Sequence, residues 1–193
     1  MKAYIVELPE KATKHISDNL FPRVMQQEYG IECSYSDVRR DANGKPQPIS
    51  GHFFNISHSG NYWCIAFSDT ECGIDIEDSA RTISPRLSRR ILARNEQPIQ
   101  DDPLRTWVLK EAYSKYRGQG IGLDFRNITA DEIMQDYLVT DLSSQSYICY
   151  AIQQKPLDNE KGPSSEGEGP KGTVVRMVHQ GRNHGSYRPT CQA

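Results

Sequence analysis

The sequence lacks a long apolar run. Residues 1–12 contain no apolar stretch of signal-peptide length, and no later run is long enough to cross a bilayer. The sequence also lacks an excess of either charge, because 23 Lys and Arg residues are balanced by 25 Asp and Glu residues, giving a net charge of −2. This balance provides no basic surface for nucleic acid and no strong attraction to a membrane. We therefore expect a cytoplasmic protein that binds neither nucleic acid nor membrane.

The sequence lacks the cysteine pattern of a zinc site or a disulfide framework. There are five cysteines, an odd number, and no two of them form a C-x-x-C pair. We expect reduced thiols, buried where they fall in strands. The 193 residues are enough for one or two small domains with a modest core.

Two carboxylates alternate with isoleucines in the segment Gly73-Ile74-Asp75-Ile76-Glu77. Successive side chains of a strand point to opposite faces, so Asp75 and Glu77 would share one face, about 7 Å apart. Neighbouring carboxylates repel each other unless a cation lies between them, and oxygen ligands favour Mg²⁺ or Mn²⁺ over zinc. The alternative is a half-buried strand with a solvated acidic face, which the alternation alone favours.

A second segment has the pattern of a helix. Apolar residues recur at helical spacing from Leu104 to Ala112, and no residue interrupts the pattern before Gly118. Within it, Glu111 and Lys115 are four residues apart and therefore share one face. They could form a surface ion pair worth on the order of 0.3 kcal/mol, which the helix alone favours. Alternatively, Glu111 is a metal ligand or proton acceptor, and Lys115 reaches a phosphate.

A third segment, residues 53–60, indicates a strand that enters a tight turn at Gly60 and leads through a hairpin into the strand of Asp75. Ser57, His58 and Ser59 offer hydroxyl, imidazole and backbone N–H donors to an anion. Adjacent Ser and His residues do not indicate a hydrolase, because the members of a catalytic triad meet in space and not in sequence.

Other elements follow from local patterns. We expect strands at residues 3–8, 137–140 and 147–153, and helices at 12–29, 84–95 and 104–117. Pro22 should mark a break in the first helix. Residues 156–172 are dominated by Pro, Gly, Ser and charge, so disorder is the default over 156–193, although residues 174–178 could form a short strand or a docking segment.

The three segments, in this order, resemble the 4′-phosphopantetheinyl transferase superfamily in its surfactin-synthetase-activating type. The resemblance lies in the motifs N-I-S-H-S-G, G-I-D-I-E and W-x-x-K-E-x-x-x-K, and it extends from about Gly44 to Ile152. It implies an α+β fold of two similar halves that form a pseudodimer within a monomeric protein. The halves would be residues 1–80, with the coenzyme A and metal motifs, and residues 81–155, with the catalytic helix.

The resemblance also implies roles for individual residues. Asp75, Glu77 and Glu111 match carboxylates that bind Mg²⁺, with Mn²⁺ as an alternative, and Glu111 also matches the general base. Lys115 matches a lysine that contacts the pyrophosphate and stabilises the leaving group, whereas Lys110 matches a position without an assigned role. Further residues match positions that contact coenzyme A or its phosphates, namely Lys45, Pro46, Ser57 and His58. For the 3′-phosphate we select Lys14, with Arg39 and Arg40 as alternatives.

The implied reaction transfers 4′-phosphopantetheine from coenzyme A, the co-substrate, to a serine of an apo acyl or peptidyl carrier protein and releases 3′,5′-ADP. Two alternatives are a catalytically silent relative that binds coenzyme A or a carrier protein, and an unrelated metal-dependent phosphohydrolase. The predicted helix at 84–95 carries four arginines, which would either meet an acidic helix of the carrier protein or face solvent; they are Arg86, Arg89, Arg90 and Arg94.

Overall fold

The computed structural model describes residues 1–13, 15–120, 124–156, 173–178 and 190–191. The strands are β1 (Lys2–Glu7), β2 (Phe53–Ser59), β3 (Tyr62–Ser68), β4 (Cys72–Asp78), β5 (Tyr137–Asp141), β6 (Tyr147–Gln154), β7 (Thr173–Val178) and β8 (Thr190–Cys191). The helices are α1 (Ile16–Tyr29), α2 (Pro85–Ile91), α3 (Pro103–Arg117) and α4 (Ala130–Asp136), with short 3₁₀ helices η1 (Tyr35–Asp37), η2 (Ile99–Asp101) and η4 (Phe125–Asn127). Among these residues no helix is long and apolar enough to cross a membrane.

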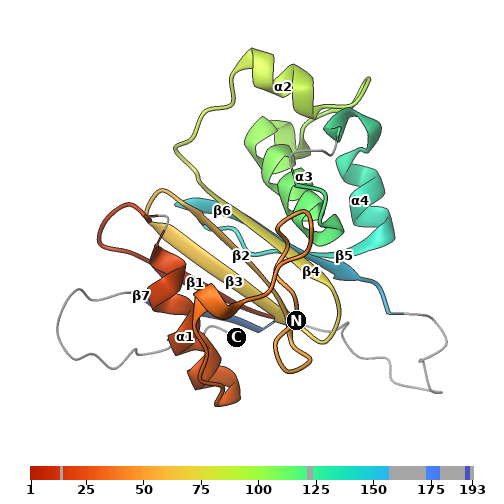
Figure 1. The fold of residues 1–193 in the computed structure, drawn as a ribbon. Helices are drawn as coiled ribbons and strands as arrows, with labels where there is room; N and C mark the ends of the chain where they lie inside the picture. The colour runs from red at the N-terminus through yellow and green to blue at the C-terminus, as the bar shows by residue number, and fades with distance from the viewer. Residues whose placement is uncertain (14, 121–123, 157–172, 179–189, 192–193) are drawn as a thin grey trace, which may run out of the picture.

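Two sheets form the centre of the molecule. The first has the strand order β2-β3-β1-β7-β8, and the second has the order β4-β6-β5. The pairing of β1 with β7 is parallel, whereas the other strand pairs are antiparallel. Helix α1 covers the first sheet, and α3 and α4 cover the second (Figure 1). The fold is α+β, as the sequence predicts. The division at residue 80 stays a prediction, and β4, which precedes it, pairs with β6, which follows it.

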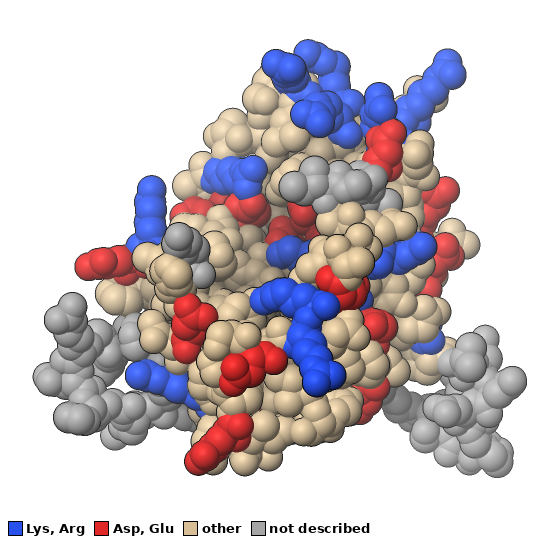
Figure 2. Space-filling model, in the orientation of Figure 1, with Lys and Arg blue, Asp and Glu red and all other residues tan. Residues whose placement is uncertain are grey.

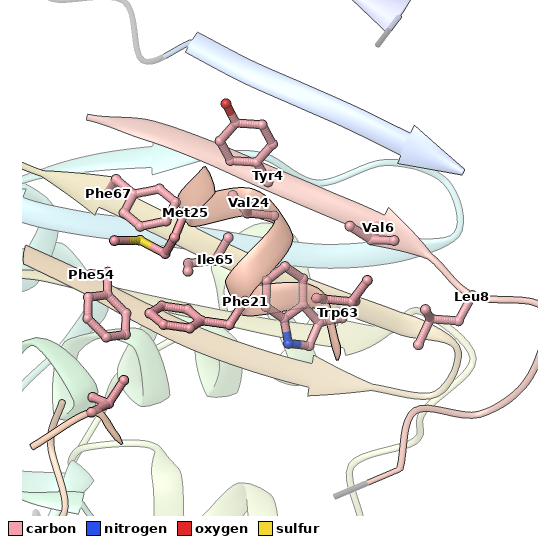
Figure 3. Close-up of a cluster of buried hydrophobic side chains, with 12 residues drawn as sticks. Tyr4, Val6, Leu8, Phe21, Val24, Met25, Phe54, Trp63, Ile65 and Phe67 are labelled. Atoms are coloured by element: carbon pink, nitrogen blue, oxygen red, sulfur yellow. The ribbon is translucent and has the colours of Figure 1, made fainter. Parts of the chain in front are cut away.

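The first hydrophobic core lies between α1 and the outer face of the first sheet (Figure 3). Alternate residues of β3 point into it, including Trp63, whose indole Nε1 donates to Ser17 Oγ at 2.9 Å. Contrary to the expected break, α1 continues through Pro22. The proline removes one backbone donor, but its neighbour Phe21 and the nearby Met25 are fully buried in this core, and this packing holds the helix together.

A second core joins the two sheets, and it fixes which way β4 faces. Ile74 and Ile76 are buried in it, together with Cys64 of β3 and Cys149 of β6. The strand alternation predicted from the sequence therefore holds, because the isoleucines point between the sheets and the remaining positions of β4 point toward α3. The four cysteines whose state is described are free thiols, as expected.

The third core packs α3 and α4 against β6, and a glycine lets α3 approach β4 closely. A Cβ atom on Gly73 would lie 2.2 Å from the carbonyl oxygen of Ala112 and 2.5 Å from the backbone nitrogen of Tyr116. These are overlaps with helix backbone, so only glycine fits at this position. Close packing of α3 on β4 brings the carboxylates of β4 beside the helix.

Helix α2 is shorter than the helix expected at 84–95. The hydroxyl of Ser84 caps its start by accepting from the backbone N–H of Leu87, but the backbone becomes extended at Leu92. The carboxylate of Glu96 then accepts from the N–H of Ala93, which stabilises a turn in place of a further helical turn. Helix α3, in contrast, has the expected end, with Gly118 in the left-handed region at φ 64°.

Two strands lie within the segment 156–193, where composition favours disorder. β7 pairs in parallel with the whole of β1, and β8 pairs with β7. The structure therefore differs from the default expectation for these residues and agrees with the alternative of a short strand at 174–178. The physical reason is that one edge of β1 would otherwise have unpaired backbone groups, which a second strand satisfies.

Candidate active site

The three segments singled out in the sequence meet in one open pocket of ≈ 340 Å³. It lies where β2, β4 and α3 come together, and Figure 2 shows acidic side chains along a hollow beneath the basic surface of α2. The lining residues are Ile56, Ser57, His58, Asp75, Glu77, Trp107, Glu111 and Lys115. Six of these are predicted site residues, and they come from all three motifs.

Asp75 is the centre of a hydrogen-bonded group that joins the three motifs. Its Oδ1 accepts from Ser57 Oγ at 2.7 Å and from Lys115 Nζ at 2.6 Å. Lys115 also donates to the carbonyl oxygen of Ile56 at 3.5 Å. Because Asp75 is buried, these donors replace the water that its charge has lost.

Glu77 has a matching pair of donors. One of its oxygens accepts from Ser59 Oγ, and the other accepts from Arg81 Nη1, four residues further along the chain. The guanidinium of Arg81 also lies over the ring of Trp107, with Cζ 5.4 Å from the ring centroid. Asp75 and Glu77 are therefore each bound by one serine of β2 and by one cation.

Glu111 is the third carboxylate of the pocket. Its pKa is raised from the ordinary 4.5 to about 7, mainly by burial and also by the negative charges of Asp75 and Glu77, against the opposing effects of Lys115 and Arg81. Burial lowers the pKa of Lys115, but the attraction and hydrogen bond to Asp75 outweigh it and hold that pKa above its ordinary value. At neutral pH the pocket therefore contains a charged lysine beside a glutamate that can gain or lose a proton.

The donor set of the pocket fits a hard divalent cation. It consists of three carboxylates, the hydroxyl of Ser57 and the imidazole of His58, with no thiolate, and oxygen ligands of this kind are those that Mg²⁺ and Mn²⁺ prefer. Within the described ranges, however, no three His, Cys, Asp or Glu side chains are arranged as a ready cation site. Instead, Lys115 and Arg81 pair with the oxygens of Asp75 and Glu77. Metal binding at Asp75, Glu77 and Glu111 stays a prediction.

Lys110 lies on a different side of α3, away from the pocket. Its ammonium group donates to Glu96 Oε2 at 2.6 Å and to the carbonyl oxygens of Ile91 and Phe125 at 2.7 and 2.9 Å. The side chains of Lys110 and Glu96 are only 0% and 4% exposed. Glu96 in turn accepts from the N–H of Ala130 at 2.8 Å. This ion pair joins α3 to α2, η4 and α4, so Lys110 has a structural role.

Other predicted contacts of coenzyme A lie outside the pocket lining. Lys45 donates to Glu71 and, at 2.5 Å, to the carbonyl oxygen of Tyr116, which ties its turn to the end of α3. Pro46 forms a bridge with Arg40, whose guanidinium donates to Gly44 at 2.9 Å. Lys14 lies outside the described residues. Coenzyme A contacts at Lys14, Lys45 and Pro46, and the alternatives Arg39 and Arg40, stay predictions.

Sequence reasoning named Ser59 only as a donor to an anion, and it assigned no role to Arg81 or Glu96. The contact of Ser59 with Glu77 could have been found, because Ser59 lies two residues after Ser57 and therefore on the same face of β2. Arg81 and Glu96 had no such signal. Their contacts depend on the turn after β4 and on the turn after α2, and neither turn has a repeating pattern.

The chain is similar to known proteins over the part that contains the pocket. A family model described as "4'-phosphopantetheinyl transferase superfamily" matches residues 71–161. Among curated relatives, 4'-phosphopantetheinyl transferase psf-1 of Bacillus pumilus is 28% identical over 126 residues, covering 60% of this chain and 54% of the relative. The transferase Sfp of Bacillus subtilis (strain 168) is 26% identical over 146 residues, covering 70% and 65%. The transferase ffp of Bacillus subtilis is 31% identical over 121 residues, covering 56% and 53%.

These alignments span between about half and two thirds of the length of the three relatives. The matched residues 71–161 contain β4, α3, β5 and β6. The similarity thus includes two sides of the pocket, with all three of its carboxylates.

Proposed function

Because the chain belongs to the 4′-phosphopantetheinyl transferase superfamily, in its surfactin-synthetase-activating type, we propose that it transfers 4′-phosphopantetheine from coenzyme A to a serine hydroxyl of an apo acyl or peptidyl carrier protein. The observation that supports this most strongly is the convergence of three carboxylates, a lysine and a serine–histidine segment in one pocket. This set provides a proton acceptor, a cation that can stabilise the leaving group, and hydrogen-bond donors for phosphate oxygens, all of which phosphoryl transfer requires.

In the proposed reaction, the carrier serine hydroxyl attacks the coenzyme A phosphorus that bears the pantetheine arm. The bond between this phosphorus and the bridging oxygen breaks, and 3′,5′-ADP leaves. Glu111 takes the proton of the attacking hydroxyl. A carboxyl group with a pKa of about 7 suits this role, because a base works best when its pKa is near the working pH.

Lys115 stabilises the negative charge of the departing phosphate. It lies one helical turn beyond Glu111, and its hydrogen bond to Asp75 holds the ammonium group at the pocket. Such an oriented cation stabilises charge that develops in the transition state. Ser57 and His58 would contact phosphate oxygens of coenzyme A.

We also propose that Asp75, Glu77 and Glu111 hold Mg²⁺, with Mn²⁺ as an alternative. A divalent ion, when bound, neutralises charge on the phosphate oxygens. Ser57 and Ser59 donate from β2 to Asp75 and Glu77, and these hydrogen bonds orient the two carboxylates that would hold the ion.

The carrier protein would dock beside the pocket through the arginines of α2. Arg86, Arg89 and Arg90 are exposed, as is Arg94 beyond the helix end, and Figure 2 shows this basic surface above the acidic hollow. Complementary charge speeds association and orients the partner, so an acidic helix of the carrier would fit here. We further propose a cytoplasmic monomer, in agreement with the free thiols of the described cysteines.

Intact-protein mass spectrometry tests the proposed function. An apo carrier protein incubated with the chain, coenzyme A and Mg²⁺ should gain the mass of one phosphopantetheine, and EDTA should prevent the gain. A phosphohydrolase would instead release phosphopantetheine into solution without a mass gain on the carrier. A silent relative would bind coenzyme A and release no product, and the presence of both Glu111 and Lys115 favours activity over this alternative.

A further inference from the structure

Arg81 is a cation beside the pocket that has no role in the reaction described above. It lies in the turn after β4, does not itself line the pocket, and contacts two residues that do: Nη1 donates to Glu77, and Cζ lies over the ring of Trp107. Its side chain is 40% exposed, compared with 28% for Lys115. Arg81 is therefore the more accessible of the two cations that pair with the carboxylates of β4.

Most of the donors of Arg81 remain available. A guanidinium has five N–H groups in a planar fork. Among the described residues its one hydrogen bond is the bond from Nη1 to Glu77. The cation–π contact with Trp107 helps to hold the guanidinium beside the pocket without using an N–H. The remaining donors are on a side chain that is 40% exposed, which suits two-point binding of a phosphate group.

The charges of the pocket indicate what binds this fork. Three carboxylates line the pocket, so an anionic diphosphate that enters meets repulsion unless several cations surround it. Lys115 already donates to Asp75 and to the carbonyl oxygen of Ile56. Arg81 is placed on the side of Glu77, away from the bond between Asp75 and Lys115, and can contact anionic oxygens there.

We propose that Arg81 binds the diphosphate of coenzyme A and so determines affinity for the co-substrate. This inference rests on the proposed function, since it takes coenzyme A as the ligand. The diphosphate is the expected partner of Arg81 because Arg81 pairs with Glu77. Glu77 is one of the three carboxylates beside which the diphosphate would react.

Isothermal titration of coenzyme A and of 3′-dephospho-coenzyme A, in the presence of Mg²⁺, tests the proposal. Arg81→Gln should weaken the affinity for both ligands by the same factor, about tenfold or more, because a hydrogen bond to a charged group is lost. Arg81→Lys keeps the charge but loses the fork, so it should show an intermediate loss. Arg126→Gln is the matched control, since Arg126 also pairs with a nearby carboxylate, but its partner Asp124 does not line the pocket, whereas Glu77 does.

The outcomes separate the possible causes. Unchanged affinity in Arg81→Gln would overturn the proposal, and so would a loss confined to coenzyme A, which would assign Arg81 to the 3′-phosphate. Full affinity in Arg81→Lys would also overturn it, since a general effect of charge would then suffice. If the unaltered chain binds neither ligand, the proposed function itself fails, and this result is distinct from normal binding with an unaffected Arg81 variant.

Discussion

The two sides of helix α3 carry the same chemistry in different settings. Lys110 and Lys115 are five residues apart, so they point about 140° apart around the helix. Each pairs with a carboxylate at 2.6 Å, Lys110 with Glu96 and Lys115 with Asp75. The first pair is almost completely buried and also binds two backbone carbonyls, whereas the second lies in an open pocket beside two further carboxylates.

The difference shows how surroundings decide the role of a lysine–carboxylate pair. The Lys110–Glu96 pair has balanced charge, and each of its partners has further hydrogen bonds, so it is suited to holding segments together. On the pocket side, three carboxylates share Lys115 and Arg81, and the charge is not balanced. An unbalanced, accessible group of charges costs stability, and such a cost is typical of a site that binds a ligand.

The largest effect should come from breaking the buried side. Lys110→Met keeps most of the unbranched side chain but leaves Glu96 charged and buried. We expect a loss of about 3–5 kcal/mol in the free energy of unfolding, measured by urea denaturation. The double variant Lys110→Met/Glu96→Gln should recover part of this loss, because no uncompensated charge remains. A double variant no more stable than the single one would contradict this account of the pair.

The corresponding change on the pocket side should affect the reaction. Lys115→Met should slow transfer to the carrier protein by about 10²–10³-fold, since it removes a cation that stabilises developing charge. The Kd for coenzyme A should change much less, which a parallel titration can measure. If affinity falls by as large a factor as the rate, then Lys115 binds the ground state and has no special role in the transition state.

The raised pKa of Glu111, on the pocket side of α3, predicts that the free energy of unfolding depends on pH. The folded protein keeps this proton to about pH 7, whereas the unfolded chain releases it near the ordinary value of 4.5. Between these values the unfolded state binds fewer protons, so stability falls as pH rises through this window.

For the metal-free protein we expect this contribution to be about 1–2 kcal/mol, after allowance for solvent screening of a partly exposed group. Denaturation at pH 5 and pH 8 measures it, and Glu111→Gln should remove this part of the difference. If the variant kept the full pH dependence, the raised pKa would have to be assigned to another group.

The smallest effect should come from the exposed surface of α2. Arg89→Glu with Arg90→Glu should raise the KM for the carrier protein several-fold and change stability by less than about 0.5 kcal/mol, because surface substitutions rarely matter more. The Kd for coenzyme A should stay the same. Arg126→Glu, an exposed arginine outside α2, serves as the control. Equal effects of both changes would show that net charge, and not a docking surface, determines the KM.

The elements that position the pocket could be predicted from the sequence, because their patterns are local. Alternation around Ile74 and Ile76 predicted that Asp75 and Glu77 share a face of β4, and helical spacing predicted that Glu111 and Lys115 share a face of α3. Close packing of these two elements also has a sequence signal, since Gly73 is the position without a side chain.

The buried pair could not be predicted in the same way. Glu96 and Lys110 are 14 residues apart, and the turn that follows α2 brings them together. The adjacent residues Lys110 and Glu111 look equivalent in the motif, although one supports the fold and the other lines the pocket. The pairing of β7 with β1 could not be predicted either, because the composition of the segment before β7 favours disorder.

The most direct test of the account is transfer by the Glu111→Gln variant. This change removes the proposed base but also removes a carboxylate that repels Asp75 and Glu77, so the variant should be at least as stable as the unaltered chain at pH 8. With coenzyme A and Mg²⁺, we predict no gain of one phosphopantetheine on the apo carrier within the time in which the unaltered chain completes the reaction. A stable Glu111→Gln variant that modifies the carrier at the normal rate would contradict the central claim that the pocket side of α3 carries out the transfer.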